Sequence, residues 1–278
     1  MLKIITRLFI ALNNRAQCIQ KLTSLPSTLI LPALVLLTAN SALAEDSSRA
    51  RLVLIIDDIG NHFELGQRAI ELPGKLNYAV LPHTPQATRL ANYAAAKGPE
   101  KEVLLHMPME AMGEQLLGPA GLYNRLDRPE FTARIDRALK EVPNAVGISN
   151  HMGSLLTQQR DKMNWLMAEL ERRNLYFIDS KTTGSSSAKY AAAEFKVPYL
   201  AREYFLDHKR NAEAMESIMK RAIANAKADG LSVVIGHPYR STLSFLEQQL
   251  PSIKAQVELI KVSEALGIQT QGQLASID

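Results

Sequence analysis

The chain has 278 residues, of which 46% are hydrophobic, and it carries 32 basic against 28 acidic side chains, a formal charge of +4. Four basic residues lie within the first 44 residues and account for this excess, which leaves 28 basic and 28 acidic residues in the remainder (32 − 4 = 28). The charge therefore gives no support for nucleic-acid binding, and no basic stripe in the sequence indicates it.

The leader over residues 1–44 has the features of a secretory signal peptide. It is basic without a single acid, contains an apolar run over 29–37 and ends in Ala-Leu-Ala at 42–44, a small-residue cleavage pattern. We expect cleavage, a mature domain over 45–278 and a periplasmic location; an uncleaved leader that anchors the protein in the inner membrane is the alternative. The one cysteine, Cys18, lies in the leader, so we expect no disulfide in the exported domain. No apolar run in the mature domain is long enough to span a bilayer.

Beyond residue 50, short apolar runs alternate with longer amphipathic stretches. The sequence predicts strands at 51–57, 76–81, 101–106, 145–149, 174–179, 199–205, 231–236 and 257–261. It predicts helices at 63–72, 85–97, 129–141, 158–173, 187–195, 211–228 and 241–254. This alternation is typical of parallel strands joined by right-handed helical crossovers. Seven or eight such units in one run predict a single α/β domain, built as a distorted (β/α)7–8 barrel of mostly parallel strands.

The first predicted strand is apolar from Leu52 to Ile56 and is followed by two adjacent acids, Asp57 and Asp58. A fully apolar strand is typical of burial on both faces, and the carboxyl ends of parallel strands form the ligand-binding face of α/β proteins. Successive strand residues point to opposite sides, so we expect the two acids to have different tasks. The alternative is that one of them caps the following helix.

The longest predicted connection runs from Met107 to Asp127, after the third strand. It is rich in glycine and shows little periodicity, and loops of this length in compact domains are often functional. We expect this loop to lie over the same face as the paired acids, where Tyr123 is available to cover a ligand.

Further polar side chains recur where the predicted strands end. They are His83, His106, Asn150, His151, Asp179 and His237. Four of the six histidines of the chain therefore stand at the carboxyl ends of strands, where a curled sheet brings side chains together on one rim.

These residue types match a known catalytic arrangement. One carboxylate and two histidines with an open coordination position form a catalytic zinc site. Such an ion polarises a carbonyl group and lowers the pKa of bound water to about 7. A second carboxylate can then accept a proton from the water, and another histidine can protonate a leaving amine. Asp57, Asp58, His106, His151 and His237 supply this set.

Several of these residues also have a structural interpretation that the sequence leaves open. His83 lies between two prolines and fits a turn, and His237 precedes Pro238 and also fits a turn. His106 fits a hydrogen-bonded side chain beneath the long loop, and Asp179 fits a cap of the next segment.

The chain resembles the divergent polysaccharide deacetylases, a branch of the polysaccharide deacetylase superfamily of metal-dependent carbohydrate esterases with a distorted β/α barrel. The segments that carry the resemblance are IIDDIG, AVLPHTP, LLHMPMEA, ISNHMGS, FIDSKTT and VIGHP, spread over the mature chain. The resemblance implies that Asp57 is the catalytic base, that Asp58 binds a metal and that His237 is the catalytic acid.

The chain departs from the superfamily in its histidine spacing. The typical member places two metal-binding histidines four residues apart on one helical turn, and no His-x-x-x-His is present here. We therefore expect His106 and His151, from different strands, to complete the metal site with Asp58.

On this basis we expect an exported hydrolase that uses zinc or another divalent metal to remove N-acetyl or O-acetyl groups from an envelope polysaccharide or its fragments. Asn150 and Asp179 are expected to orient the reacting groups, with His83 and Tyr123 as further contacts of the site or the sugar.

Two alternatives remain open on the sequence alone. The first is a non-catalytic glycan-binding or envelope-scaffold protein on the same barrel, which the missing His-x-x-x-His favours. The second is a serine hydrolase that uses Ser154 or Ser180, which is weaker because the chain has no Gly-x-Ser-x-Gly elbow.

Overall fold

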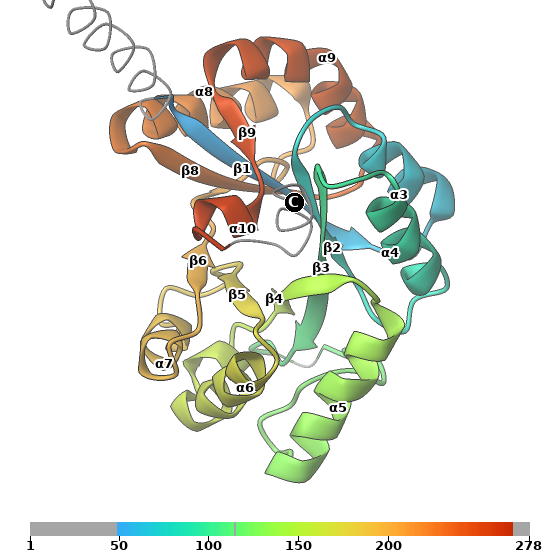
Figure 1. Ribbon diagram of the computed structural model, residues 1–278, viewed down its shortest axis with the longest axis vertical. Coiled ribbons are helices and arrows are strands. Elements are labelled where there is room, and N and C mark those ends of the chain that lie inside the picture. The colour runs from blue at the N-terminus through green and yellow to red at the C-terminus, as the bar shows by residue number, and fades with distance from the viewer. Residues whose placement is uncertain (1–48, 114, 269–278) are drawn as a thin grey trace, which may run out of the picture. The chain divides into compact units, whose positions relative to one another are not determined.

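The strands of the computed structural model, which describes residues 49–113 and 115–268, pair in parallel within one curled sheet (Figure 1). They are β1 (Arg51–Ile59), β2 (Leu76–Val80), β3 (Lys101–Met109), β4 (Ala145–Met152), β5 (Tyr176–Asp179), β6 (Tyr199–Ala201), β7 (Tyr204–Phe205), β8 (Leu231–Gly236) and β9 (Glu258–Ile260). Their order in the sheet is β6-β5-β4-β3-β2-β1-β8-β7, and β9 pairs with the start of β1. The predicted leader lies outside the described residues.

Helices follow most strands and lie around the outside of the curled sheet (Figure 1). They are α3 (Phe63–Ile70), α4 (Ala87–Ala96), α5 (Arg128–Glu141), α6 (Arg160–Arg172), α7 (Ala188–Glu194), α8 (Ala212–Asp229), α9 (Arg240–Gln256) and the short α10 (Val262–Ala265). None of the helices described is both long enough and apolar enough to cross a membrane. The predicted α/β fold, a distorted barrel of parallel strands, is confirmed.

The apolar run of β1 explains why this strand lies at the centre of the fold. Val53 and Ile55 pack inside the barrel with residues such as Ile235 of β8, whereas Leu52 and Leu54 pack in the larger cluster beneath the helices. All of these side chains are buried, because successive strand residues face the two covered sides of a parallel sheet. The strand thereby holds the two acids near its carboxyl end in a fixed position.

The predicted strand over 199–205 is two short strands at opposite ends of the sheet. β6 pairs with β5 and β7 pairs with β8, and two residues lie between them. The backbone N–H of Arg202 donates to Asp179 O of β5, and the backbone N–H of Glu203 donates to Val233 O of β8. The sheet is therefore a distorted half-barrel whose two ends are joined by this one segment.

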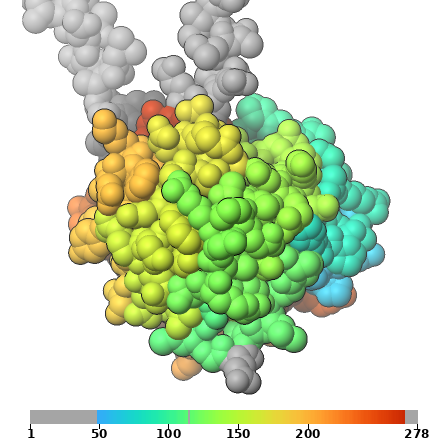
Figure 2. Space-filling model, turned by 90° about the horizontal axis from the view of Figure 1, so that it is seen from below, coloured from blue at the N-terminus to red at the C-terminus, as the bar shows by residue number. Residues whose placement is uncertain are grey.

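β3 and β4 are longer than predicted. They end at Met109 and Met152 instead of at 106 and 149, so His106 and His151 lie within strands. The long loop begins at Glu110, and Leu122 returns to form a bridge with the end of β3. In Figure 2 the green residues of this loop and of α5 lie beside the yellow residues of α6 on one face of the molecule.

The amino-terminal end of the barrel is closed by α10. The backbone N–H of Val262 donates to Asn77 Oδ1, and the backbone N–H of Ser263 donates to Glu102 Oε1. Tyr176 Oη also donates to Glu102 Oε1, at 2.7 Å. The buried polar side chains at this end are thus hydrogen-bonded to the helix that covers them.

Candidate metal centre

The two adjacent acids lie in a bulge of β1. Ile56 pairs with Tyr78 and Ile59 with Val80, so β1 has one more residue than β2 between these pairs. Asp58 has a φ of 58°, which is rare for a residue other than glycine and is concentrated at functional sites. Such bulges redirect side chains. Strict alternation would point the two carboxylates to opposite sides; here both lie within 3.5 Å of the same ring nitrogen, His106 Nε2.

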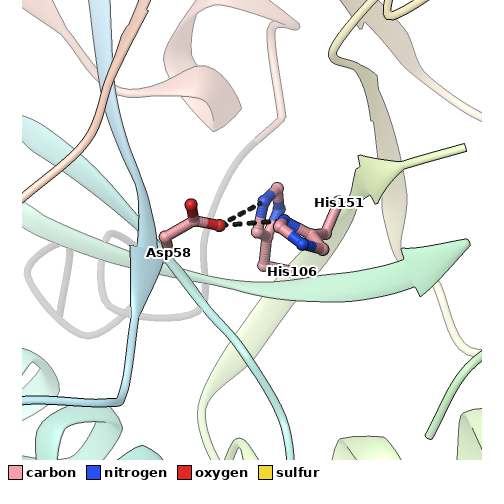
Figure 3. Close-up of side chains that lie close together, drawn as sticks. All are labelled: Asp58, His106 and His151. Carbon is pink, nitrogen blue, oxygen red and sulfur yellow. Dashed lines mark ion pairs between the residues drawn. The ribbon is translucent and has the colours of Figure 1, made fainter. Parts of the chain in front are cut away.

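Asp58, His106 and His151 converge on one point at the carboxyl end of the barrel (Figure 3). Asp58 Oδ1 lies 3.3 Å from His106 Nε2 and 2.9 Å from His151 Nδ1. His106 is buried and the other two are partly buried. The structure thus brings together the three residues that the sequence proposes as metal ligands.

The pairing of β3 with β4 places the two histidines side by side. His106 pairs with Ser149 and Pro108 with His151, so the histidines come from neighbouring strands. Their ring centroids lie 5.1 Å apart at an angle of 72°. His106 Nδ1 lies 2.7 Å from Ser149 Oγ, and a proton on Nδ1 leaves the lone pair of Nε2 directed at Asp58. Two paired strands therefore replace the single helical turn of a His-x-x-x-His motif.

The donor set fits a divalent metal ion. Asp58 Oδ1 is buried and has no hydrogen-bond partner among the described residues, although two imidazole nitrogens lie near it. Ligands about 2.0 to 2.2 Å from a tetrahedral ion lie about 3.3 to 3.6 Å apart. The three donor atoms lie within 4.8 Å of one another, so small shifts would let them share one ion. Burial raises the pKa of Asp58, but His106 and His151 outweigh it and hold the pKa well below its ordinary value.

Asp57 lies beside this cluster and is almost fully buried. Its Oδ2 is 3.5 Å from His106 Nε2, and its Oδ1 has no hydrogen-bond partner in the described part of the chain. Burial raises the pKa of Asp57, a change that the neighbouring histidines only partly oppose. The carboxylate therefore has a free oxygen and a raised affinity for a proton, which are the properties of a general base.

His237 approaches the cluster from β8 and is paired with a buried acid, Asp207. His237 Nδ1 lies 2.8 Å from Asp207 Oδ1, and the backbone N–H of His237 donates to Asp207 Oδ2. His237 Nε2 points to the cluster, 4.0 Å from Asp58 Oδ2. Burial lowers the pKa of His237, but the hydrogen bond and charge of Asp207 raise it to about 9 overall. The imidazole is therefore protonated at neutral pH and can donate a proton from Nε2.

Asn150 and Asp179 fix the backbone around the site. Asn150 Oδ1 accepts from the Ser180 N–H and Asn150 Nδ2 donates to Met152 O, so this side chain joins β4 to the end of β5. Asp179 accepts hydrogen bonds from the Lys181 N–H and from the hydroxyl groups of Ser186 and Tyr199. Both side chains are buried.

His83 and Tyr123 are the other two contacts that the sequence proposes. His83 Nδ1 is 4.0 Å from Glu141 Oε1, and no contact joins it to the three-residue cluster in the described residues. Tyr123 lies in the long loop, where its hydroxyl accepts from the Leu117 N–H. Its expected contact with a ligand stays a prediction.

Sequence reasoning missed Asp207, Ser149 and Arg202. Asp207 follows the predicted strand 199–205, so the signal used for Asp179, an acid directly after a strand, also marks it. Arg202 donates from Nε to Ser180 O and stacks on Phe205, with its guanidinium carbon 3.7 Å from the ring centroid. No local pattern marks Ser149, which only strand pairing brings beside His106, or Arg202, which lies near enough to Asp57 for that carboxylate to oppose the lowering of its pKa by burial.

Two cavities adjoin the cluster, and Tyr239 lines both of them. The larger, about 470 Å³, includes Asp58, Asn61 and His62 in its lining. The smaller, about 230 Å³, is lined in part by His237. A ligand therefore has room beside Asp58 and beside His237.

Comparison with known proteins gives matches in both sequence and fold. The family described as divergent polysaccharide deacetylase matches residues 54–266. The uncharacterized protein YibQ of Escherichia coli K12 is 35% identical over 225 residues, 81% of this chain and 70% of YibQ. The crystal structure of the uncharacterized protein ATU2773 from Agrobacterium tumefaciens C58 has a TM-score of 0.74 at 18% identity, covering 78% of this chain and 89% of that chain. Wild-type BA3943, a CE4 family pseudoenzyme from Bacillus anthracis, has a TM-score of 0.50 at 14% identity, covering 79% and 66%. At these identities the two structures show likeness of fold alone.

Proposed function

Because this chain belongs to the divergent polysaccharide deacetylase family, we propose that it is a zinc-dependent hydrolase that removes acetyl groups from N-acetylated sugars of an envelope polysaccharide. The observation that carries the proposal is the buried oxygen Asp58 Oδ1, which has no hydrogen-bond partner among the residues that the structure describes and faces nitrogens of His106 and His151. One carboxylate and two imidazoles are a donor set found in catalytic zinc sites, which keep a further position open.

Asp58, His106 and His151 would hold the ion, which when bound supplies the polarisation of the acetyl carbonyl and the acidification of water. Asp57 accepts the proton of the attacking water, because its Oδ1 has no hydrogen-bond partner within the described ranges and burial raises its pKa. A buried carboxylate is suited to this task since its neutral form is favoured after the transfer.

His237 donates a proton to the leaving nitrogen of the sugar. Its Nε2 faces Asp58, and its Nδ1 is held by Asp207, which keeps the ring protonated and fixes its orientation. Thr242 Oγ1 donates to Asp207 Oδ2 at 2.9 Å and helps to hold that carboxylate in place. A base and an acid thus both lie beside the metal ligands, where one can take the proton of the water and the other can protonate the leaving amine.

The remaining site residues position this machinery. Asn150 holds the end of β5 against β4. Asp179 holds the segment after β5 through hydrogen bonds from Lys181 and Ser186, and it also accepts from Tyr199 of β6. Tyr123, in the loop after β3, would cover the sugar. We also propose that the protein acts in the periplasm after its leader is removed. Cell fractionation with mass determination of the mature chain separates this location from a membrane anchor.

The metal content of the chain, purified without a histidine tag, tests the proposal together with release of acetate from N-acetylated glycans. We expect about one zinc per chain, a loss of that zinc in His151→Ala, and retention in the control His83→Ala. Both variants remove one imidazole near strand ends, but His83 contacts Glu141 instead of the cluster. Zinc that persists in His151→Ala would contradict the assigned site.

A second candidate is a glycan-binding or scaffold protein without efficient catalysis. It is favoured by the absence of His-x-x-x-His, since the two histidines of the cluster here come from two different strands. Failure to bind zinc even when the ion is added, combined with retained affinity for an N-acetylated oligosaccharide, would support this candidate over the hydrolase.

A further inference from the structure

The smaller cavity beside His237 contains an arginine held in place by an aromatic ring. Its lining consists of Phe205, Asp207, His208, Arg210, His237 and Tyr239. The guanidinium carbon of Arg210 lies 3.7 Å from the centroid of the Tyr239 ring. Tyr239 in turn packs on His237, with ring centroids 5.6 Å apart. The stack places a fixed positive charge one ring away from the proposed catalytic acid.

The donors of Arg210 are free for a ligand. In the residues that the structure describes, no carboxylate pairs with Arg210 and its guanidinium donates no hydrogen bond. The one acid in the lining, Asp207, is buried and both of its oxygens are bound by His237 and Thr242. The cavity therefore presents a planar cation without presenting a free anion to neutralise it.

We propose that this cavity binds a carboxylate of the substrate glycan through Arg210, so that the preferred substrate is an acidic N-acetylated polysaccharide. The guanidinium group offers two parallel N–H donors whose geometry matches a carboxylate. The inference rests on the proposed function in taking the ligand to be a glycan, and it adds the class of glycan.

A carboxylate suits this cavity better than a phosphate group. Among the described residues, Arg210 is the one arginine or lysine in the lining, and the charge of His237 is paired with that of Asp207. The remaining single charge of Arg210 balances a single carboxylate. A phosphate monoester carries about −1.5 to −2 charges at neutral pH and accepts through three oxygens, so it favours a cluster of donors.

The position of Tyr239 links the carboxylate to the reacting sugar. Tyr239 lines both this cavity and the larger one that contains Asp58. A glycan lying across Tyr239 therefore has one sugar beside the metal ligands and an acidic group within reach of Arg210. An acidic substituent on the reacting sugar or on its neighbour meets this requirement.

The test compares two N-acetylated tetrasaccharides by calorimetric titration of the full chain. Chitotetraose is neutral, and the hyaluronan tetrasaccharide carries carboxylates. We expect the wild-type protein to bind the hyaluronan tetrasaccharide about tenfold more tightly. Arg210→Gln should remove this preference and leave the affinity for chitotetraose unchanged, because the amide keeps a polar side chain without the charge.

Arg89→Gln is the matched control. Arg89 is also an exposed arginine stacked on an aromatic ring, 3.6 Å from the centroid of Phe63, but it lies on α4. This variant should keep the full preference for the acidic tetrasaccharide. A wild-type protein that binds both probes equally or binds neither, or an Arg210→Gln variant that keeps the preference, would overturn the inference.

Two further measurements separate the other outcomes. The first measurement compares the binding of N-acetylglucosamine 6-phosphate with that of N-acetylglucosamine. If the protein prefers the phosphorylated sugar, if this preference depends on Arg210 and if the hyaluronan tetrasaccharide is not preferred, the site binds a phosphate group and the proposed carboxylate site is overturned. Acetate release is followed in parallel. A preference for the acidic tetrasaccharide without acetate release would refute the hydrolase and retain the acidic-glycan site. Acetate release without that preference would retain the hydrolase and refute the acidic-glycan site.

Discussion

The two ends of the barrel both bury polar side chains, but they differ in whether those side chains have hydrogen-bond partners. At the amino-terminal end, Glu102 accepts from Tyr176 and from Ser263, and Asn77 both donates and accepts. At the carboxyl end, Asp57 Oδ1 and Asp58 Oδ1 are buried without a hydrogen-bond partner in the described residues. The same barrel interior therefore holds one cluster that is complete by itself and one that is not.

This difference separates a structural cluster from a functional one. A buried polar atom without a partner loses its hydrogen bonds to water and gains none in return, which typically costs about 1 to 3 kcal/mol. Two such atoms next to three histidines are explained if a metal and a water molecule complete the site. Burial of polar residues alone does not indicate function, since the end covered by α10 has it too.

The largest expected effect is that of Asp57→Asn on turnover. Asparagine cannot accept the proton of the attacking water, so kcat should fall by about 10²- to 10⁴-fold while zinc remains bound by the other three side chains. Acetate release and metal content measured on the same preparation check this. Full activity in Asp57→Asn would refute its assignment as the base.

Asp207→Asn should act through the pKa of His237. The hydrogen bond and charge of Asp207, followed by the charges of Asp57 and Asp58, raise this pKa from 6.5 to about 9 against the effect of burial, so loss of the Asp207 carboxylate lowers the pKa. The alkaline limb of the rate profile should move to lower pH, with about a tenfold loss of rate at pH 8. The imidazole resonances of His237, followed by NMR across the same pH range, distinguish this from a general loss of structure.

The raised pKa of His237 also makes the free energy of unfolding depend on pH. Because the folded form binds the proton more tightly than the unfolded form, the contribution is complete below pH 6.5 and is lost as the pH rises to about 9. Unfolding of the metal-free protein by urea should show this loss in the wild type and much less of it in Asp207→Asn.

Glu102→Gln should lower stability and leave kcat unchanged, whereas Asp57→Asn should lower kcat. The amide cannot satisfy the donors of Tyr176, Ser263 N and Ser263 Oγ as the carboxylate does, so the free energy of unfolding should fall by about 1 to 3 kcal/mol. Metal content and kcat should stay at the wild-type values. A loss of zinc in this variant would show that the two ends are not independent.

The smallest expected effect is a gain in stability of the metal-free protein in Asp57→Asn. The folded state raises the pKa of Asp57, so ionisation opposes folding and the stability falls as the pH rises above 3.8. Replacing the carboxylate by an amide should raise the free energy of unfolding by about 1 kcal/mol at pH 7 and by less at pH 4. Thermal unfolding at both pH values measures the difference.

Much of the fold could be predicted because its signals are local. The apolar run before Asp57 and the repeated alternation of strand and helix indicated parallel strands in a barrel, and the same reasoning located His106 and His151 near strand ends. The features of the fold that the sequence did not predict depend on pairing between segments that are distant in the chain. The bulge at Asp58 is defined by its register with β2, and the division of 199–205 is defined by β5 and β8.

The candidate site shows the same limit. Histidine and aspartate next to an apolar run are conspicuous, so five of the central residues could be proposed from the sequence. Ser149 could not be proposed, because nothing distinguishes it from other serines in strands until its pairing with His106 is known. The pairing of Asp207 with His237 could not be proposed either, because 30 residues separate them in the chain. His83 shares the sequence pattern of the others, but its contact is with Glu141.

The segment that joins the two ends of the half-barrel also covers the outer edges of β5 and β8. An open sheet exposes unpaired N–H and C=O groups along its outer strands, and these can recruit strands of other molecules. Here β6 covers the edge of β5 and β7 covers the edge of β8, and both belong to one short piece of chain. Substitution of Arg202 by proline would remove the N–H that bonds to Asp179 O, and the loosened edges would then be open to intermolecular pairing.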